Sequence, residues 1–435
     1  MNLYDFSKKI SNLKKQGNYA QALQFFKENK HNFQDEEIKN NKWLISNIIT
    51  CLRKTNQSRF IHTFLQNFNI QINENTEELI LNAYGWCLYD NIKNKVYSKY
   101  EIIDNLQYPI SLLSRLNSNF SYTIISNILR EGFKIAKEYQ NQDYNFTNDF
   151  CNLFDKNILS VECNSFEING KTTEQASDQE KWYSEKSKSL FELKKFQECF
   201  ELSKEALEKI NNFHNNNDLW FARRIALSKK ELGNIDDAIT DLEVIYKKKR
   251  DWFIQKEISE LYFDKNDIDN AFKNAILAIN NKGKLEFKIG LIFLLGKILK
   301  IKNEAVLAYQ HFLLVKKVRE ENQWKLPDEL MVEINNLKIN DIYETKQLIK
   351  NLKQYWTSFL PKKEIKQGKI KKILNDNERG KNGFIYCNDD EEYYFTIPSH
   401  INFIDKIEEN IKVSFEVIQL KYGKEKAKII KIGNI

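Results

Sequence analysis

One short pattern recurs along this chain and constrains its fold more than any other feature. It begins with a turn residue, continues two positions later with an aromatic or aliphatic residue, and ends with a small residue. The clearest copy is Gly17, Tyr19 and Ala22. The small residues of the later copies lie 39, 33 and 37 positions apart, at Cys199, Ala238, Ala271 and Ala308. A period of about 34 residues is typical of paired helices that cannot bury their apolar faces singly and therefore stack.

The composition favours a mostly helical, folded protein. Only four prolines occur in 435 residues, and proline breaks helix interiors. Hydrophobic residues make up 42% of the chain, which is enough to build packed cores. We find no signal peptide and no apolar run of the roughly 18 residues that a membrane span needs. The chain is therefore expected to be cytoplasmic and not to bind membranes.

The sequence carries no recognisable active site. The six cysteines lack CxxC spacing and the five histidines are scattered singly, which predicts reduced, mostly buried thiols and no metal site. Neither a phosphate-binding glycine loop nor a GxSxG elbow is present. We expect no catalytic residues, no cofactor and no enzyme activity. A nuclease with an unrecognised site is kept as an alternative.

Patterning divides the chain into three regions. Residues 1–163 form an N-terminal helical region with weak or degenerate repeats, and residues 181–356 form a repeat solenoid. The polar stretch 164–180 between them is expected to be a linker or a long loop. After Pro361 glycines cluster and apolar residues alternate, which predicts about five short strands and a small barrel over residues 365–435.

The helical part resembles the tetratricopeptide repeat family. Residues 14–23 and 233–239 match its turn motif, and Leu295-Gly296 matches its first helix. Lys194 and Asn266 stand where the family has a turn glycine. The family holds peptides in a groove lined by the first helix of each pair. In this chain, the positions that correspond to the family's groove are those of Lys188, Phe191, Arg223, Lys230, Lys256, Phe263, Phe293, Lys297 and Lys300.

Basic and aromatic residues alternate along the predicted groove. Such a surface suits the carboxylates of an acidic peptide, because charge-assisted hydrogen bonds are stronger than neutral ones. It also suits a phosphate backbone. The third interpretation is a solvated face, in a chain with 67 basic and 60 acidic residues and a net charge of only +7. That balance permits nucleic acid or an acidic peptide as partner and requires neither.

Residues 367–432 resemble a cold-shock domain, a barrel of the OB type. Residues 380–385 and 393–397 are similar to the two RNA-binding motifs of that family. The resemblance implies that Phe384 and Tyr394 stack on unpaired bases, and that Lys372 and Lys381 meet phosphates.

The barrel segment also departs from the family pattern. The family has tryptophan at the position of Lys372, phenylalanine at that of Asn382 and histidine at that of Thr396. Losing these rings should weaken binding to single strands. A barrel kept as a protein-docking or structural module is therefore the competing interpretation.

These observations predict a mostly α protein in which a tetratricopeptide-like α-solenoid is followed by a small five-stranded OB-type β-barrel. The function expected is that of a non-enzymatic adaptor. Its solenoid would bind a protein partner, and its barrel would bind single-stranded nucleic acid, in the first place RNA. A pure protein–protein scaffold is the alternative.

Overall fold

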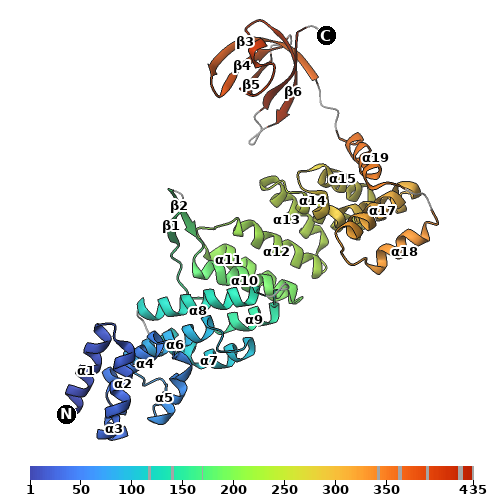
Figure 1. The fold of residues 1–435 in the computed structure, drawn as a ribbon. Coiled ribbons are helices and arrows are strands. Elements are labelled where there is room, and N and C mark those ends of the chain that lie inside the picture. The colour runs from blue at the N-terminus through green and yellow to red at the C-terminus, as the bar shows by residue number, and fades with distance from the viewer. Residues whose placement is uncertain are drawn as a thin grey trace. The chain divides into compact units, whose positions relative to one another are not determined.

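A computed structural model of the chain describes residues 1–115, 119–138, 142–168, 170–339, 343–360, 365–387, 391–419 and 425–433. The chain divides into two units, Met1–Ile339 and Asn340–Ile435. In these described ranges the first unit is helical apart from one β-hairpin, and the second contains one α-helix and a closed barrel (Figure 1). The expected fold class, helical repeats followed by a five-stranded barrel, is therefore confirmed. No described helix has the length and hydropathy to cross a membrane.

The N-terminal part of the first unit is built from α1 (Leu3–Lys15), α2 (Tyr19–Asn29), α3 (Asp35–Lys39), α4 (Lys42–Lys54), α5 (Ile61–Asn67), α6 (Glu78–Lys93), α7 (Lys99–Arg115), α8 (Asn119–Lys137) and α9 (Tyr144–Asn152). Helices α4 and α6 are its centre, since most of their residues are buried. The apolar side chains form a single hydrophobic cluster that extends from Phe6 in α1 to Phe221 in the repeat array. The two helical regions distinguished in the sequence therefore share part of one core.

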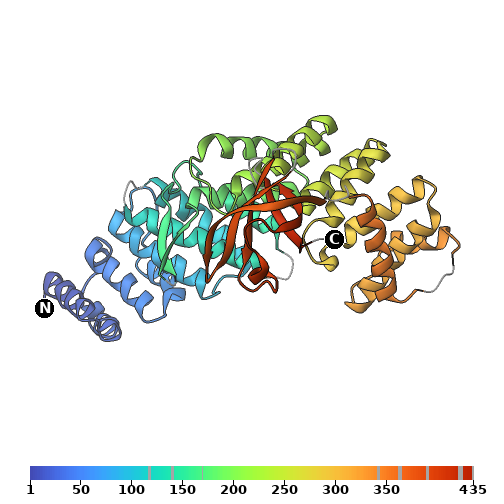
Figure 2. The same ribbon diagram turned by 90° about the horizontal axis from the view of Figure 1, so that it is seen from above.

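Four helix pairs follow, formed by α10 (Asp178–Glu192) and α11 (Phe196–Lys209), α12 (Asn217–Glu231) and α13 (Ile235–Lys248), α14 (Trp252–Asp264) and α15 (Ile268–Asn280), and α16 (Ile289–Ile301) and α17 (Ala305–Glu321). They stack in chain order (Figures 1 and 2). Helix α18 (Asp328–Asn336) packs on α17, and α19 (Thr345–Ser358) belongs to the second unit.

The recurring sequence pattern has a direct structural meaning. The turn residue of each copy adopts a left-handed backbone, with φ of 78° at Gly17, 60° at Lys194, 92° at Gly233, 60° at Asn266 and 64° at Asn303. Five positions later the small residue is fully buried in every copy, at Ala22, Cys199, Ala238, Ala271 and Ala308. Glycine suits this position because it has no Cβ, and asparagine tolerates the left-handed region because its short polar side chain can hydrogen-bond locally, whereas Lys194 adopts it with a full side chain. The small residue then lets the two helices of a pair approach closely.

The same turn hydrogen bond closes the first helix of every pair. The amide after the left-handed residue donates to a carbonyl five positions back, for example Asn234 to Lys229 at 2.8 Å and Glu304 to Leu299 at 2.9 Å. This bond satisfies a carbonyl that the helix end would otherwise leave unpaired. Each turn is therefore specified locally, whereas the stacking of pairs is not.

The stretch expected to be a linker or long loop is instead a β-hairpin, so that expectation was wrong. Strand β1 (Asn164–Ile168) pairs antiparallel with β2 (Lys171–Gln175). Gly170 in the turn has a φ of +73°, a conformation that glycine adopts without strain. The overlooked signal is the Asn-Gly dipeptide at 169–170, which strongly favours two-residue hairpin turns. In Figure 1 the hairpin stands out from the helices around it.

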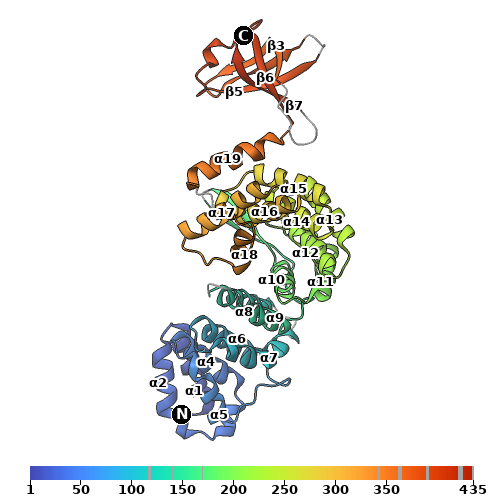
Figure 3. The ribbon, with the colours of Figure 1, turned by 90° about the vertical axis from the view of Figure 1, so that its right-hand side faces the viewer.

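The barrel consists of β3 (Ile365–Asn377), β4 (Gly380–Tyr386), β5 (Glu392–Pro398), β6 (Lys412–Gln419) and β7 (Glu425–Ile432) (Figure 3). Its strand order is β3-β4-β5-β7-β6, and pairing of β3 with β6 closes it. Among the strands that the structure describes, only β5 and β7 pair in parallel. Inward-facing residues such as Ile370, Ile385, Phe395 and Phe415 form its core. A short 3-10 turn, Ile404–Lys406, lies between β5 and β6.

Candidate functional site

The nine predicted groove residues all lie on the first helices of their pairs, α10, α12, α14 and α16. Five of them line one cavity of about 330 Å³ between α12, α14, α16 and α18. These five are Lys230, Lys256, Phe263, Phe293 and Lys297. The structure therefore brings the C-terminal part of the predicted groove together in one place.

The charges of this cavity are balanced. Its lining includes three carboxylates beside the three lysines, from Glu260, Asp264 and Glu329. The ion pairs are Lys256 to Glu260 at 2.5 Å, Lys230 to Asp264 at 3.2 Å and Lys297 to Glu329 at 3.4 Å. The cavity is therefore not a purely cationic groove, although the alternating basic and aromatic residues allowed one.

Two aromatic rings lie close to the ammonium group of one of these lysines. The Lys297 ammonium lies 5.0 Å from the ring centre of Phe293 and 5.6 Å from that of Phe263. Rings attract a cation through their negatively charged faces. At Lys230, burial is the largest single effect and opposes the charged form. The hydrogen bond to Asp264 and the charges of the neighbouring carboxylates together outweigh it and raise the pKa of that lysine. The cavity therefore offers charged ammonium groups beside apolar ring surface.

The other four predicted groove residues are not among those that line this cavity. Arg223 pairs with Glu257 of the next first helix, with Nε to Oε2 at 2.9 Å, and Lys300 pairs with Glu333 of α18 at 2.5 Å. Lys188 donates to the Gln142 side chain, and Phe191 packs against Phe196. The contacts of Arg223, Lys300 and Phe191 join two helices, and that of Lys188 joins α10 to the segment before α9. They give the four residues a structural role in the array.

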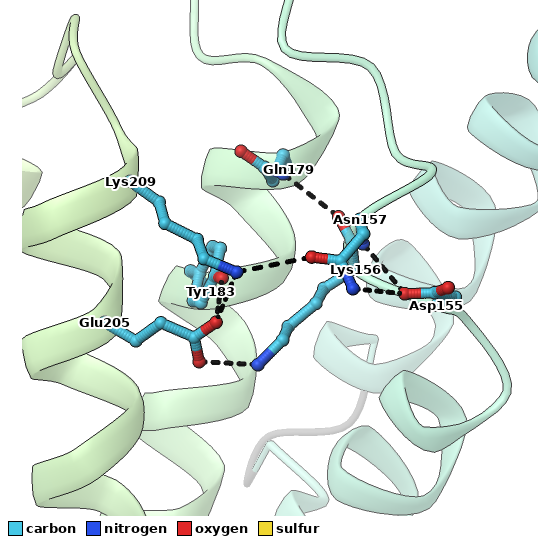
Figure 4. A network of polar contacts seen from close by, with 7 residues as sticks. All are labelled: Asp155, Lys156, Asn157, Gln179, Tyr183, Glu205 and Lys209. Atoms are coloured by element: carbon cyan, nitrogen blue, oxygen red, sulfur yellow. Dashed lines mark hydrogen bonds and ion pairs between the residues drawn. The ribbon is translucent and has the colours of Figure 1, made fainter.

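A second polar network joins the end of the N-terminal helices to the first repeat (Figure 4). Glu205 of α11 accepts from Lys156 at 2.5 Å, from Lys209 at 2.8 Å and from the Tyr183 hydroxyl at 3.0 Å. Burial opposes the charge of Glu205, but these donors outweigh it and lower the pKa of the carboxylate. The backbone of Lys156 also accepts from Gln179 at 3.0 Å. This network anchors the loop after α9 to the first helix pair of the repeat array.

On the barrel, three of the four predicted nucleic-acid residues form one row. Lys372 of β3 lies directly opposite Phe384 of β4, and Phe384 lies directly opposite Tyr394 of β5. The two ring centres are 5.6 Å apart at an interplanar angle of 63°. Both rings are half-buried and Lys372 is exposed. Directly opposed residues share one face of a sheet, so this row is a surface on the outside of the barrel, called here the ring row.

Lys381 does not belong to the ring row. It is an odd number of positions from Phe384 on the same strand, and successive side chains on a strand point to opposite faces. Its ammonium donates to the Ile407 carbonyl at 3.2 Å and pairs with Asp376 at 3.0 Å. The role predicted for Lys381 at a phosphate stays a prediction, and its contacts lie within the barrel.

The structure adds residues that the sequence analysis missed. Tyr386 lies two positions after Phe384, opposite Lys369, and is 38% exposed. On the other side of the ring row, Asn382 lies opposite Thr396, whose hydroxyl accepts from Lys426 of β7. The outer face therefore presents three rings and at least three lysines across four strands. The two-residue spacing of Phe384 and Tyr386 was the signal that could have found the third ring.

Comparisons with known proteins give the chain no family. A scan of protein families finds no match, and neither does a search of curated proteins. Among solved structures, a tetratricopeptide repeat protein from Parabacteroides merdae is 15% identical with a TM-score of 0.31, covering 78% of this chain and 98% of its own. Human IFIT1 in complex with m7Gppp-AAAA is 14% identical with a TM-score of 0.33, covering 79% and 81%. The TPR domain of P58(IPK) is 12% identical with a TM-score of 0.27, covering 81% and 99%.

Proposed function

We propose that this protein is a non-enzymatic adaptor whose barrel binds single-stranded nucleic acid and whose helical repeats hold a protein partner. The observation that carries the proposal is the ring row, in which Lys372, Phe384 and Tyr394 lie in register on the outer face of the barrel. The two functions are joined in one chain, which raises the effective concentration of one ligand near the other.

The ring row supports nucleic-acid binding through the chemistry of its side chains. Aromatic faces stack on any base, and lysines neutralise the phosphates that accompany the bases. Lys369 and Tyr386 extend the row along the same face, and Lys426 adds a charge from β7. Single strands expose their bases and suit such a surface, whereas a duplex hides them.

The topology of the barrel supports the same proposal. Barrels of the OB class have five strands in a Greek-key arrangement and bind oligonucleotides on the face of their second and third strands. Here the second and third strands of the barrel are β4 and β5, which carry Phe384 and Tyr394. RNA is the ligand we propose, because of the resemblance to cold-shock domains, and DNA is an outcome that the experiment distinguishes.

The cavity between α12, α14, α16 and α18 supports the binding of a peptide. A carboxylate of an incoming peptide would replace Asp264 or Glu329 at Lys230 or Lys297, and an apolar side chain would lie on Phe293. The exchange of one carboxylate for another costs little in electrostatic energy, because a pair is broken and a pair is formed. Selectivity would then come from ring contacts and shape.

Fluorescence anisotropy with labelled single-stranded RNA and DNA tests the barrel. We expect binding that weakens as salt is raised, with a slope of about −0.7 per phosphate neutralised. Phe384→Ala and Tyr394→Ala should each cost about 1–3 kcal/mol, which is about 5- to 150-fold in Kd. Tyr100→Ala is the matched control, since it removes a ring that is 79% exposed on α7, in the other unit.

Two results would reject the nucleic-acid part of the proposal. One is the absence of binding by the wild-type chain at low salt, and the other is unchanged affinity in the Phe384→Ala, Tyr394→Ala double variant. Either result would favour a scaffold whose barrel has a structural or docking role.

A charge reversal tests the groove separately. Lys297→Glu should abolish recovery of a partner in affinity purification followed by quantitative mass spectrometry, and Phe293→Ala should reduce it. Lys273→Glu is the control, because Lys273 is exposed on α15, a second helix. If a protein is recovered equally with all three variants, it does not bind in this cavity, and the groove part of the proposal is wrong.

A further inference from the structure

Cys163, Glu174 and His214 converge beside the β1–β2 hairpin, although they are 11 and 40 positions apart in the sequence. Cys163 directly precedes β1, Glu174 lies in β2, and His214 lies in the loop between α11 and α12. One ligand atom of each, the thiol sulfur, a carboxylate oxygen and a ring nitrogen, lies within 4.8 Å of the other two. No sequence motif links them.

The hairpin register places two of these side chains on one face. Glu174 pairs with Ser165, and Cys163 lies two positions before Ser165. Since strand residues two positions apart point the same way, the thiol and the carboxylate face the same side of the hairpin. His214 approaches them from the helical array.

The imidazole of His214 is held in a fixed orientation by a buried carboxylate. Glu180 has no exposed surface, and it accepts from the His214 amide at 2.8 Å, from His214 Nδ1 at 2.9 Å and from Asn217 Nδ2 at 2.8 Å. The two residues after His214, Asn215 and Asn216, have φ of 53° and 58°. Left-handed backbone at non-glycine residues costs energy and persists where the surroundings require it. The turn directs the ring toward Glu180 on one side and Glu174 on the other.

This orientation leaves Nε2 of His214 facing an acceptor. When Nδ1 donates to Glu180, a neutral ring presents a lone pair at Nε2, and Oε2 of Glu174 lies 3.2 Å away. Two acceptors at this distance repel unless a positive charge lies between them. The sulfur of Cys163 lies within 4.8 Å of a nitrogen of the ring and an oxygen of the carboxylate, so a metal ion between the three groups would satisfy both acceptors.

We propose that Cys163, Glu174 and His214 bind one zinc-class divalent metal ion, which fastens the β1–β2 hairpin to the repeat array. Thiolate, imidazole and carboxylate are the ligands of Zn²⁺ in proteins, and a thiolate selects against Mg²⁺ and Ca²⁺. Glu180 is the carboxylate that orients the histidine from behind, an arrangement that typically accompanies histidine ligands. Glu174 is 47% exposed, so a water molecule can complete a tetrahedral site.

Metal titration of the full-length chain tests the site. After treatment with a chelator, we expect the protein to bind one equivalent of Zn²⁺ in competition with a chromophoric chelator. Co²⁺ in place of zinc should show the thiolate-to-cobalt charge-transfer band of a site with one cysteine ligand. Cys163→Ser should remove that band, and Glu180→Gln should weaken zinc binding by about 10- to 100-fold.

Glu174→Gln and Glu167→Gln form a matched pair on the same hairpin. Both change exposed carboxylates, but only Glu174 belongs to the cluster. We expect Glu174→Gln to weaken zinc binding at least tenfold and Glu167→Gln to leave it unchanged, while circular dichroism shows that both variants fold. Hydrogen exchange in residues 171–175 should slow when zinc is added to the wild-type chain.

The proposal is overturned if the wild-type chain binds no zinc at micromolar concentration. In that case His214 is a protonated bridge between Glu174 and Glu180. It is also overturned if Glu174→Gln binds zinc as tightly as Glu167→Gln, or if the cobalt complex lacks the thiolate band.

Discussion

Substituting alanine for Gly296 should destabilise the repeat array, because this position in α16 has no room for a methyl group. A Cβ at Gly296 would lie 2.4 Å from Cε1 and 2.7 Å from Cδ1 of Phe312. The Phe312 ring in α17 is fully buried and also packs on Phe293, with ring centres 5.4 Å apart. The ring therefore cannot turn into solvent to relieve the clash.

The size of the effect follows from two opposing contributions. Overpacking a tight core costs about 1–3 kcal/mol. Alanine is favoured over glycine in a helix interior by about 0.5–1 kcal/mol. The net loss in the free energy of unfolding is therefore between about 0 and 2.5 kcal/mol, centred on about 1 kcal/mol. Urea unfolding of the full chain, followed by far-ultraviolet circular dichroism, measures this loss as a lower transition midpoint.

Gly290→Ala in the same helix is the control. A Cβ at Gly290 would meet only the Lys256 Cε, at 3.4 Å, which is the far end of a flexible side chain. Its unfolding free energy should be unchanged or higher by at most about 1 kcal/mol. If Gly296→Ala proved as stable as Gly290→Ala, the argument that close packing of α16 on α17 determines this glycine would be refuted.

Three further predictions concern buried groups. Burial lowers the pKa of His311 to about 4, so the unfolded chain takes up a proton near its ordinary pKa of 6.5 while the fold does not. The free energy of unfolding should therefore fall by up to about 3 kcal/mol between pH 6.5 and 4. Thermal melts at the two pH values should show a smaller loss of stability in His311→Asn than in the wild type. Lys186→Met should cost about 1–3 kcal/mol in urea unfolding, because it removes the ammonium that donates to two oxygens of the buried Asn148, and an unchanged midpoint would contradict this. Gly383→Ala should disrupt the barrel, because a Cβ there would lie 2.0 Å from the Lys372 carbonyl oxygen, and hydrogen exchange as slow as in the wild-type barrel would count against it.

Features specified by neighbouring residues were predictable from the sequence. A left-handed turn residue followed five positions later by a buried small residue is a local pattern, and it correctly identified helix pairs such as α12 and α13. Alternating apolar residues after Pro361 likewise predicted strands, because the side chains of a strand alternate between core and solvent. The same alternation could have shown that Lys381 and Phe384 do not share a face.

The ion pairs along the groove could not be predicted from the sequence. Arg223 and Glu257, like Lys230 and Asp264, are 34 positions apart, so their contact depends on how one helix pair stacks on the next. A lysine on a predicted groove face looks the same in the sequence whether it is paired or available. Only the stacked array shows which carboxylate each one meets.

The sequence alone determined that this chain forms helix pairs and then a barrel, since backbone turns and apolar periodicity act over a few residues. The tertiary structure decided which side chains meet, as with Cys163, Glu174 and His214. Such a cluster joins a hairpin to a distant loop, and its geometry depends on the packing of all the elements between them. Local chemistry therefore fixes the elements, and long-range packing builds the candidate sites.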